Sequence, residues 1–317
     1  MDASPRTSAC APCSPAGSSK TASFPSRRRR SSRHTTAKAT DSFTTGSAVS
    51  SAILAGWLRC PRCGQDLEQH NNLDLACSEG HHYDANRRGY LNTLDGSRGI
   101  HGDTRGILLA REAFLARGHY QPIADALSSA LPSRRDLQIL DSGCGTGYYL
   151  KRGLAARPGA EGLALDASAA AVTIAVAATG AAGLVADVWR ELGIRSSRAD
   201  VVLCVFAPRN ASEFARVLRP DGSLIVVTPQ PEHLAELRAE GRLLGMQDDK
   251  LGQLDATLGE LFELESRESL DYRVDLSPAE ADLVAAMGPS GHHELAETAV
   301  DHRDVTVAVD VSVFVKL

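Results

Sequence analysis

The sequence predicts an α/β protein with a mostly parallel sheet and, in front of it, a small metal-binding domain. Short apolar runs alternate with Ala- and Leu-rich helical stretches from Leu137 onward, which is typical of parallel strands joined by crossover helices. A glycine-rich turn follows the first of these runs, and three cysteines cluster between residues 60 and 77. Of the 317 residues, 43% are hydrophobic and 23% are charged, so the chain can bury a sizeable core and is not disordered throughout.

The first 50 residues differ in composition from the rest. They are rich in Ser, Thr, Arg and Pro, and they carry eight Lys or Arg against two Asp. A segment with so few large apolar residues cannot offset its ordering entropy, so we expect a disordered tail. The run 27–30 of four arginines is an RNA-binding arm, a targeting signal or an extension without a role. The other residues carry 26 basic and 37 acidic side chains, which disfavours a sequence-blind nucleic-acid coat protein.

The cysteines indicate the compartment. There are seven, an odd number, and they are clustered rather than spread as a disulfide framework would be. No signal peptide is visible, and no apolar run approaches the roughly 18 residues that cross a bilayer. We therefore expect a cytoplasmic protein that does not span a membrane, in which clustered cysteines hold a metal.

The metal-binding segment has the spacing Cys60-x2-Cys63-x13-Cys77-x3-His81. Two ligand pairs of this kind, each on a tight turn, complete a tetrahedral site of three thiolates and one imidazole, which zinc prefers. His82 is an alternative fourth ligand, and buried free cysteines are the alternative to a metal site. Because four protein ligands leave no position for a catalytic water, we expect a structural zinc ion rather than zinc-dependent hydrolysis.

The remaining elements follow in order. Apolar residues at helical spacing predict a helical region over 102–130, and a further helix is expected over 211–219. We expect the chain to divide into three parts: a disordered tail over 1–50, a zinc-binding domain over 51–100, and a linker helix with the sheet domain over 101–317. The expected parallel strands are Leu137–Leu140, Gly162–Leu165, Gly183–Ala186, Val201–Phe206 and Ser223–Val227, and Glu263–Val274 and Val305–Val315 are expected as antiparallel edge strands.

The glycine turn indicates the ligand. It contains Asp141, Gly143, Gly145 and Gly147, and a helical stretch begins at Tyr148. The dinucleotide fingerprint Gly-x-Gly-x-x-Gly fails because Tyr148 occupies its last position. Asp-x-Gly-x-Gly-x-Gly is instead the pattern of S-adenosylmethionine-dependent methyltransferases, so we predict a Rossmann-like class I methyltransferase domain that binds this donor at the turn.

Other residues have predicted places around the donor. Asp166 follows the second strand and is placed to accept hydrogen bonds from ribose hydroxyls, and Asp187 follows the third and could accept from the adenine amino group. Each has an alternative role as a helix N-cap or turn residue. His119 and Tyr120 are expected to cover the donor pocket or to pack against it.

With these residues in place, the chain from about Trp57 onward resembles the RlmA family of 23S ribosomal RNA guanine-N1 methyltransferases, and within it the tylosin-resistance branch, type II. The resemblance implies that zinc helps to recognise an RNA hairpin in domain II of 23S rRNA, that one guanine there is methylated, and that this contributes to resistance against tylosin-type macrolides. It rests on the zinc-ligand pattern, Gly89-Tyr90-x-Asn92, Gly102-Asp103, Ala110-Arg111, Gly118-His119-Tyr120-x-Pro122, Ala186-Asp187-Val188-Trp189, Val205-Phe206-Ala207-Pro208-Arg209-Asn210, Thr228-Pro229-Gln230, His233-Leu234-Ala235-Glu236-Leu237 and Met287-Gly288-Pro289-Ser290.

The guanine pocket is expected beside the end of the fourth strand, because N1 must be presented to the donor there. We predict that Arg209 or Asn210 contacts O6 and that Phe206 helps to wall the base, and the alternative is that residues 208–210 cap the next helix. Arg87 and Arg88 are predicted to contact the RNA backbone, and the alternative is a solvated surface.

Two other functions compete with rRNA methylation at this point. One is a small-molecule methyltransferase with a structural zinc lid, and the other is a non-catalytic zinc-ribbon RNA-binding protein. A homodimer is also left open by the sequence.

Overall fold

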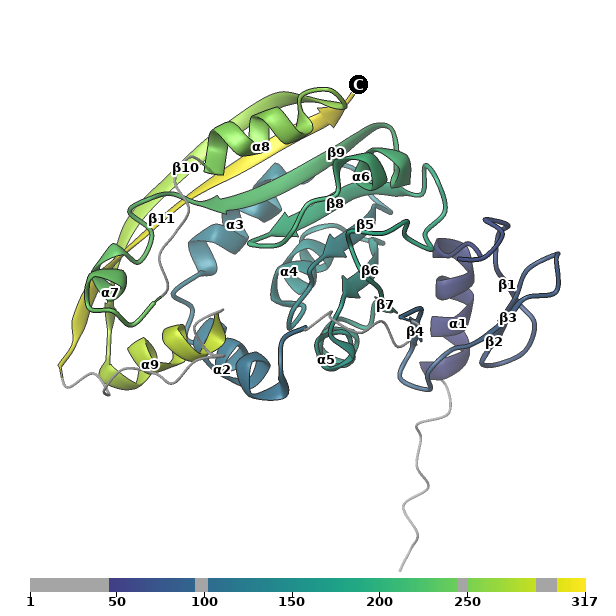
Figure 1. Ribbon diagram of the computed structural model, residues 1–317, viewed down its shortest axis with the longest axis horizontal. Coiled ribbons are helices and arrows are strands. Elements are labelled where there is room, and N and C mark those ends of the chain that lie inside the picture. The colour runs from purple at the N-terminus through teal and green to yellow at the C-terminus, as the bar shows by residue number, and fades with distance from the viewer. Residues whose placement is uncertain (1–45, 95–101, 244–249, 289–300) are drawn as a thin grey trace, which may run out of the picture. The chain divides into compact units, whose positions relative to one another are not determined.

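The computed structural model describes residues 46–94, 102–243, 250–288 and 301–317 (Figure 1). Most of the tail expected over 1–50 therefore lies outside the described residues, as does part of the segment 287–290. The described part begins with helix α1, Gly46–Trp57, which the sequence did not predict. Among the described helices, none is long and apolar enough to cross a membrane.

The cysteine-containing segment forms a three-stranded antiparallel sheet, β1-β2-β3 in order. Its strands are short, namely β1 Glu68–Gln69, β2 Asp74–Ala76 and β3 His82–Asp84. Leu54, Trp57 and Leu75 are fully buried where this sheet meets α1. They belong to the same apolar cluster as Leu140 and Val202 of the main sheet, so the two sheets share one core.

The main sheet has eight strands in the order β10-β11-β9-β8-β5-β6-β7-β4. The strands from β4 to β9 pair in parallel, β11 pairs antiparallel with β9, and β10 pairs antiparallel with β11. All seven predicted strands are present, and β10 is an edge strand as predicted, but the prediction of β11 as an edge strand is wrong because β11 lies between β10 and β9. The bounds are β4 Tyr90–Asn92, β5 Gln138–Ser142, β6 Glu161–Asp166, β7 Ala182–Val185, β8 Ala199–Val205, β9 Leu218–Pro229, β10 Phe262–Leu276 and β11 Arg303–Lys316.

Strand β4 was not predicted, and it connects the cysteine-containing segment to the main sheet. It follows the cysteine segment directly, yet it pairs with β7 of the main sheet. The chain order reverses between β5 and β8, which lie side by side. In a parallel sheet this switch point opens a crevice at the carboxyl ends of the strands, where ligands bind.

Helices cover both faces of the main sheet. Buried residues of α3, α4 and α5 pack on one face, and buried residues of α1, α6 and α8 pack on the other. The predicted region 102–130 is two helices rather than one, because the chain turns at Gly118, whose φ is 85°. The helix predicted over 211–219 is present but ends at Val217, where β9 begins. The bounds are α2 Arg105–Leu115, α3 Gln121–Ala130, α4 Tyr148–Ala156, α5 Ala169–Thr179, α6 Ala211–Val217, α7 Ala235–Ala239, α8 Lys250–Leu258 and α9 Pro278–Met287.

Candidate functional site

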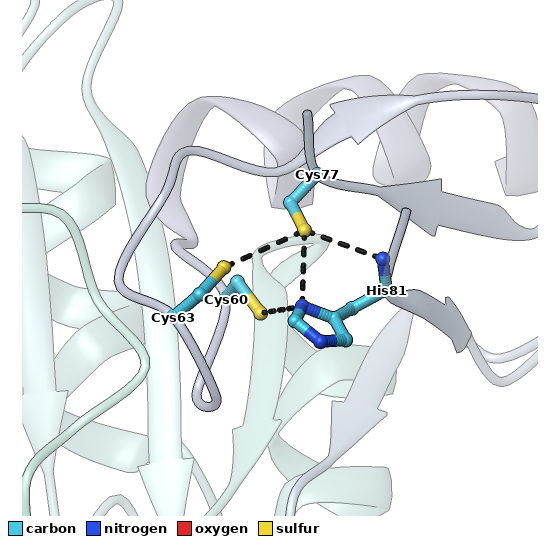
Figure 2. A group of neighbouring side chains, drawn as sticks. All are labelled: Cys60, Cys63, Cys77 and His81. Atoms are coloured by element: carbon cyan, nitrogen blue, oxygen red, sulfur yellow. Dashed lines mark hydrogen bonds between the residues drawn. The ribbon is translucent and has the colours of Figure 1, made fainter. Parts of the chain in front are cut away.

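The four predicted zinc ligands converge on one point (Figure 2). The sulfur atoms of Cys63 and Cys77 are 3.6 Å apart, and His81 Nδ1 lies 3.4 Å from Cys77 Sγ and 3.5 Å from Cys60 Sγ. A tetrahedral ion with Zn–S bonds of about 2.3 Å places two thiolates about 3.7 Å apart. The donor set and its spacing therefore fit zinc.

Two tight turns hold these ligands in place. Gly64 donates its amide to the Cys60 carbonyl oxygen, and Gly80 donates to the Cys77 carbonyl oxygen, both with φ above 70°. Burial would raise the pKa of the Cys60 thiol, but hydrogen bonds, chiefly with the Tyr83 hydroxyl 3.1 Å away, lower that pKa to about 6. A backbone hydrogen bond with Gln65 would lower the pKa of Cys63, but burial and the neighbouring sulfur atoms raise that pKa to about 11, so one thiol of the adjacent pair ionises more readily than the other.

His82 does not join this group. Its Nδ1 lies 2.9 Å from a carboxylate oxygen of Asp74, while the neighbouring His81 faces the cysteines. Consecutive side chains of an extended chain point to opposite sides, so only one of the two histidines can face the cysteines. The geometry favours His81 as the fourth ligand.

The glycine turn links β5 to α4 and is tightly packed. Gly143, Gly145 and Gly147 all have positive φ, of 79°, 51° and 76°. A Cβ atom at Gly143 would lie 2.5 Å from Ala207 Cβ, and one at Gly147 would lie 2.9 Å from Ala175 Cα. These positions require glycine both for backbone conformation and for space, so the backbone of the turn is tightly constrained beside the crevice.

Two carboxylates lie at this turn, that of the buried Asp141 and that of the half-buried Asp166. Asp166 accepts hydrogen bonds from the amides of Gly145, at 3.0 Å, and Ser168, at 2.8 Å. Burial, with a smaller effect of the Asp166 charge, raises the pKa of Asp141 to about 7, and burial also raises the pKa of Asp166. A positively charged ligand beside these two carboxylates would lower their pKa values and favour their ionised forms. S-adenosylmethionine carries a sulfonium and an ammonium group, so this site fits it.

Unsatisfied hydroxyl groups lie next to the same turn. The side-chain oxygens of Ser142, Tyr148 and Tyr149 are buried, and the structure records no hydrogen-bond partner for them among the described residues. Buried hydroxyls nearly always have partners in a folded protein. A polar ligand in the crevice would supply partners. Tyr148 is the first residue of α4, where the sequence predicted a helix to begin.

His119 and Tyr120, in the turn between α2 and α3, point in different directions. His119 Nε2 lies 2.9 Å from a carboxylate oxygen of Glu280 in α9. The Tyr120 hydroxyl lies 3.1 Å from Nε2 of the buried His233. Tyr120 therefore faces the strand ends, whereas His119 ties its turn to α9.

Phe206 stands directly after β8 with an unusual backbone. Its φ is 52°, its side chain is 41% exposed, and its ring stacks on His233 with centroids 5.8 Å apart. Positive φ is rare for a bulky residue and is often found at functional sites. His233 Nδ1 accepts from the Ala308 amide at 3.3 Å, so the ring proton is on Nε2, which donates to Tyr120. No role for His233 was predicted from the sequence, since its partners are far from it in the chain.

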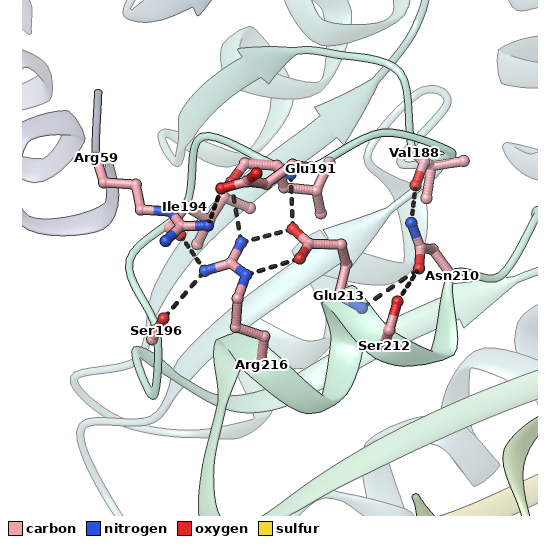
Figure 3. Close-up of polar contacts among 10 residues, drawn as sticks. Arg59, Val188, Glu191, Ile194, Ser196, Asn210, Ser212, Glu213 and Arg216 are labelled. Carbon is pink, nitrogen blue, oxygen red and sulfur yellow. Dashed lines mark hydrogen bonds and ion pairs between the residues drawn. The ribbon is translucent and has the colours of Figure 1, made fainter. Parts of the chain in front are cut away.

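Asn210 acts as the cap of α6 (Figure 3). Its Oδ1 accepts from the Glu213 amide and its Nδ2 donates to the Val188 carbonyl oxygen at 2.8 Å. The alternative foreseen for Asn210 is thus the role that the structure shows. Arg209 beside it is half-buried, and its guanidinium has no hydrogen bond or ion pair within the described ranges.

Two residues near the glycine turn were not predicted from the sequence as site residues. Asp103 and Arg111 form an ion pair at 2.6 Å, and the Asp103 carbonyl oxygen accepts from Ser168 Oγ. Arg111 lies 3.1 Å from where a Cβ of Gly145 would stand. Both occur in the segments that carry the resemblance, but the sequence gives no sign that they fold over the glycine turn.

The other predicted residues lie at the surface. Asp187 follows β7, is half-buried, and accepts from the amide of the exposed Trp189 at 3.0 Å. With this contact Asp187 acts as a turn residue, which was the alternative role predicted for it. Its second carboxylate oxygen lies 3.5 Å from Arg190 Nε. Arg87 and Arg88 are exposed in the turn between β3 and β4.

Comparisons with known proteins agree with this geometry. A family model described as "RlmA, N-terminal", a zinc ribbon, matches residues 58–95, and one described as "Methyltransferase domain" matches residues 139–222. A Streptomyces fradiae protein named 23S rRNA (guanine(748)-N(1))-methyltransferase is 41% identical over 245 residues, covering 75% of this chain and 86% of the relative. A Micromonospora griseorubida protein, provisionally named 23S rRNA (guanine-N(1)-)-methyltransferase, is 41% identical over 257 residues, covering 74% of this chain and 87% of the relative. The chain therefore belongs to the RlmA family of 23S rRNA (guanine-N1)-methyltransferases.

Proposed function

We propose that this protein transfers a methyl group from S-adenosylmethionine to N1 of a guanine in a domain II hairpin of 23S rRNA. The observation that carries the proposal is the glycine turn with the carboxylates of Asp141 and Asp166, in a chain whose zinc ribbon is followed directly by β4 of the same sheet. The ribbon favours a folded RNA over a small metabolite as the substrate. Family membership favours an active enzyme over a non-catalytic binding protein.

We propose that the donor binds at the glycine turn. S-adenosylmethionine supplies an electrophilic methyl group on a sulfonium. Asp141 and Asp166 attract its positive charge, Tyr148 offers a hydroxyl group, and Tyr120 closes the side next to Phe206. The three glycines of the turn and Asp187, just after β7, also belong to the set, as does His119, whose contact with Glu280 holds the turn that carries Tyr120. The residues that we assign to the donor are thus Asp141, Gly143, Gly145, Gly147, Tyr148, Asp166, Asp187, His119 and Tyr120.

The guanine site is proposed at the end of β8. The exposed ring of Phe206 offers a stacking surface for an extruded base. Guanine N1 carries a proton that must leave, and Arg209 can donate to O6 and so stabilise the developing negative charge. Asn210 acts indirectly: by capping α6 and holding the Val188 carbonyl group, it positions Arg209.

The zinc ribbon is proposed as the RNA-recognition part. Cys60, Cys63, Cys77 and His81 hold zinc, which fixes the two turns of the ribbon. Arg87 and Arg88 follow on an exposed turn, where they can contact phosphates. A methylated guanine in this hairpin would contribute to resistance against tylosin-type macrolides, and a rise in the tylosin tolerance of a sensitive strain that expresses the gene would test this.

Methylation is tested with zinc-replete full-length protein, labelled donor and unmethylated 23S rRNA, read by mass spectrometry of RNA fragments. N1-methylguanine at one position is expected. A labelled metabolite or the absence of transfer would contradict the proposal. Arg209→Ala should slow the transfer with donor affinity unchanged, whereas Arg135→Ala, an exposed arginine just before β5, should not.

A further inference from the structure

A second group of metal-binding side chains lies in the zinc ribbon, apart from the cysteines. His70 Nδ1 and His82 Nδ1 lie 3.2 Å and 2.9 Å from the same carboxylate oxygen of Asp74. One ligand atom from each of the three residues lies within 4.8 Å of the others. The two imidazole rings meet edge to face with centroids 5.3 Å apart.

The backbone holds these three side chains in place without a metal. His70 and Asp74 flank the turn between β1 and β2, where the His70 amide donates to the Asp74 carbonyl oxygen at 2.9 Å. The Asn71 side chain accepts from the amides of Leu73 and Asp74 within the same turn. His82 opens β3, which pairs with β2. Binding would therefore require little reorganisation of the chain.

This group is separate from the cysteine site. His81 and His82 are adjacent in the chain, but His81 Nδ1 lies near the sulfur atoms and His82 Nδ1 lies near Asp74. The ribbon therefore presents one group of ligands on each side of the chain where β3 begins.

The distances and the donor types suit a transition metal. A tetrahedral ion with bonds of about 2.0–2.1 Å to nitrogen and oxygen has ligand atoms about 3.3 Å apart, close to the 2.9 and 3.2 Å seen here. Two imidazoles and a carboxylate suit zinc, cobalt, nickel and copper ions. The Asp74 side chain is only 15% exposed, whereas those of His70 and His82 are 63% and 52% exposed, so the carboxylate is sheltered and the two rings are accessible from solvent.

We propose that His70, Asp74 and His82 bind a divalent transition-metal ion in addition to the ion held by the cysteines. The second ion cross-links the β1–β2 turn to β3 and leaves a coordination position open to an oxygen ligand. An ordinary imidazole–carboxylate pair offers a contrast within the same chain. His302 lies 3.2 Å from Asp275, and no third ligand joins them among the described residues.

The test uses full-length protein whose cysteine site is filled with zinc, titrated with Co²⁺. A second equivalent of metal should bind, with d–d absorption but without thiolate-to-cobalt charge transfer. His70→Ala and Asp74→Asn should each abolish this absorption, and the matched control His302→Gln should keep it. Retention of the absorption in both ligand variants would overturn the proposal.

A measurement on the wild-type protein alone decides the question without variants. In the cobalt-bound protein, the imidazole N–H protons of His70 and His82 should show large paramagnetic NMR shifts. Their absence, or the absence of any cobalt binding beyond the cysteine site, would overturn the proposal whatever the variants do.

Discussion

Gly143→Ala should weaken donor binding by a steric effect that can be separated from backbone strain. The added Cβ would lie 2.5 Å from Ala207 Cβ, about 0.9 Å inside the 3.4 Å at which ordinary contact begins. Neither atom belongs to a flexible side chain, so the glycine turn itself must move by about that amount. A displacement of about 1 Å in a site can reduce activity by up to about 100-fold. We expect donor affinity to fall at least about tenfold, which corresponds to about 1.4 kcal/mol.

The matched control is Gly180→Ala. Gly180 has φ of 72°, nearly the 79° of Gly143, but a Cβ there would meet no atom within 4 Å. It therefore carries the left-handed strain alone, about 1–2 kcal/mol of unfolding free energy. Urea unfolding should show this loss in both variants, and calorimetry with S-adenosylhomocysteine should show weakened binding only in Gly143→Ala.

A second substitution tests the cause directly. Once the Ala207 methyl group is removed, the new Cβ would lie 3.8 Å from Ala207 Cα, which is an ordinary contact distance. The double variant Gly143→Ala/Ala207→Gly should therefore bind the donor product within about threefold of Ala207→Gly alone, because the two sites are in direct contact and their effects are not additive. Equal affinities for Gly143→Ala and Gly180→Ala, or no recovery in the double variant, would refute the reasoning.

Three further predictions concern charge and metal. Because burial raises the pKa of Asp141 to about 7, its ionisation opposes folding above the unfolded value of 3.8 and does so fully above pH 7. Asp141→Asn should therefore raise the unfolding free energy at pH 8 by up to roughly 4 kcal/mol, with no such gain at pH 3, as measured by urea unfolding. The same substitution should weaken binding of the cationic donor, as measured by calorimetry. Replacing Arg87 and Arg88 together by Ala should weaken rRNA binding and lower the slope of log affinity against log salt by about 2, measured by filter binding. Removal of zinc by a chelator should lower rRNA affinity more than donor affinity, and an equal loss of both would contradict the proposed division of roles.

The sequence predicted the parallel strands because each is a short apolar run with clear ends, and β5, for example, is buried along its whole length. It could not predict β4, since Tyr90–Asn92 is only three residues long and pairs with Gly183–Val185 far along the chain. The same limit applies to the site. The glycine turn is local and was recognised, whereas His233 meets Tyr120 only through folding, across a separation of 113 residues.

The shared core bears on what the zinc ion stabilises. A ribbon of about 35 residues has too little core to fold alone, so a bound metal would be expected to supply its folding free energy. The structure qualifies this, because Leu54, Trp57 and Leu75 pack in the same cluster as Leu140 of the main sheet. This packing on the main sheet adds to the stabilisation that the metal supplies. Zinc removal should then loosen the turns at the cysteines while α1 and β4 stay attached, which is why donor binding should survive a treatment that weakens RNA recognition.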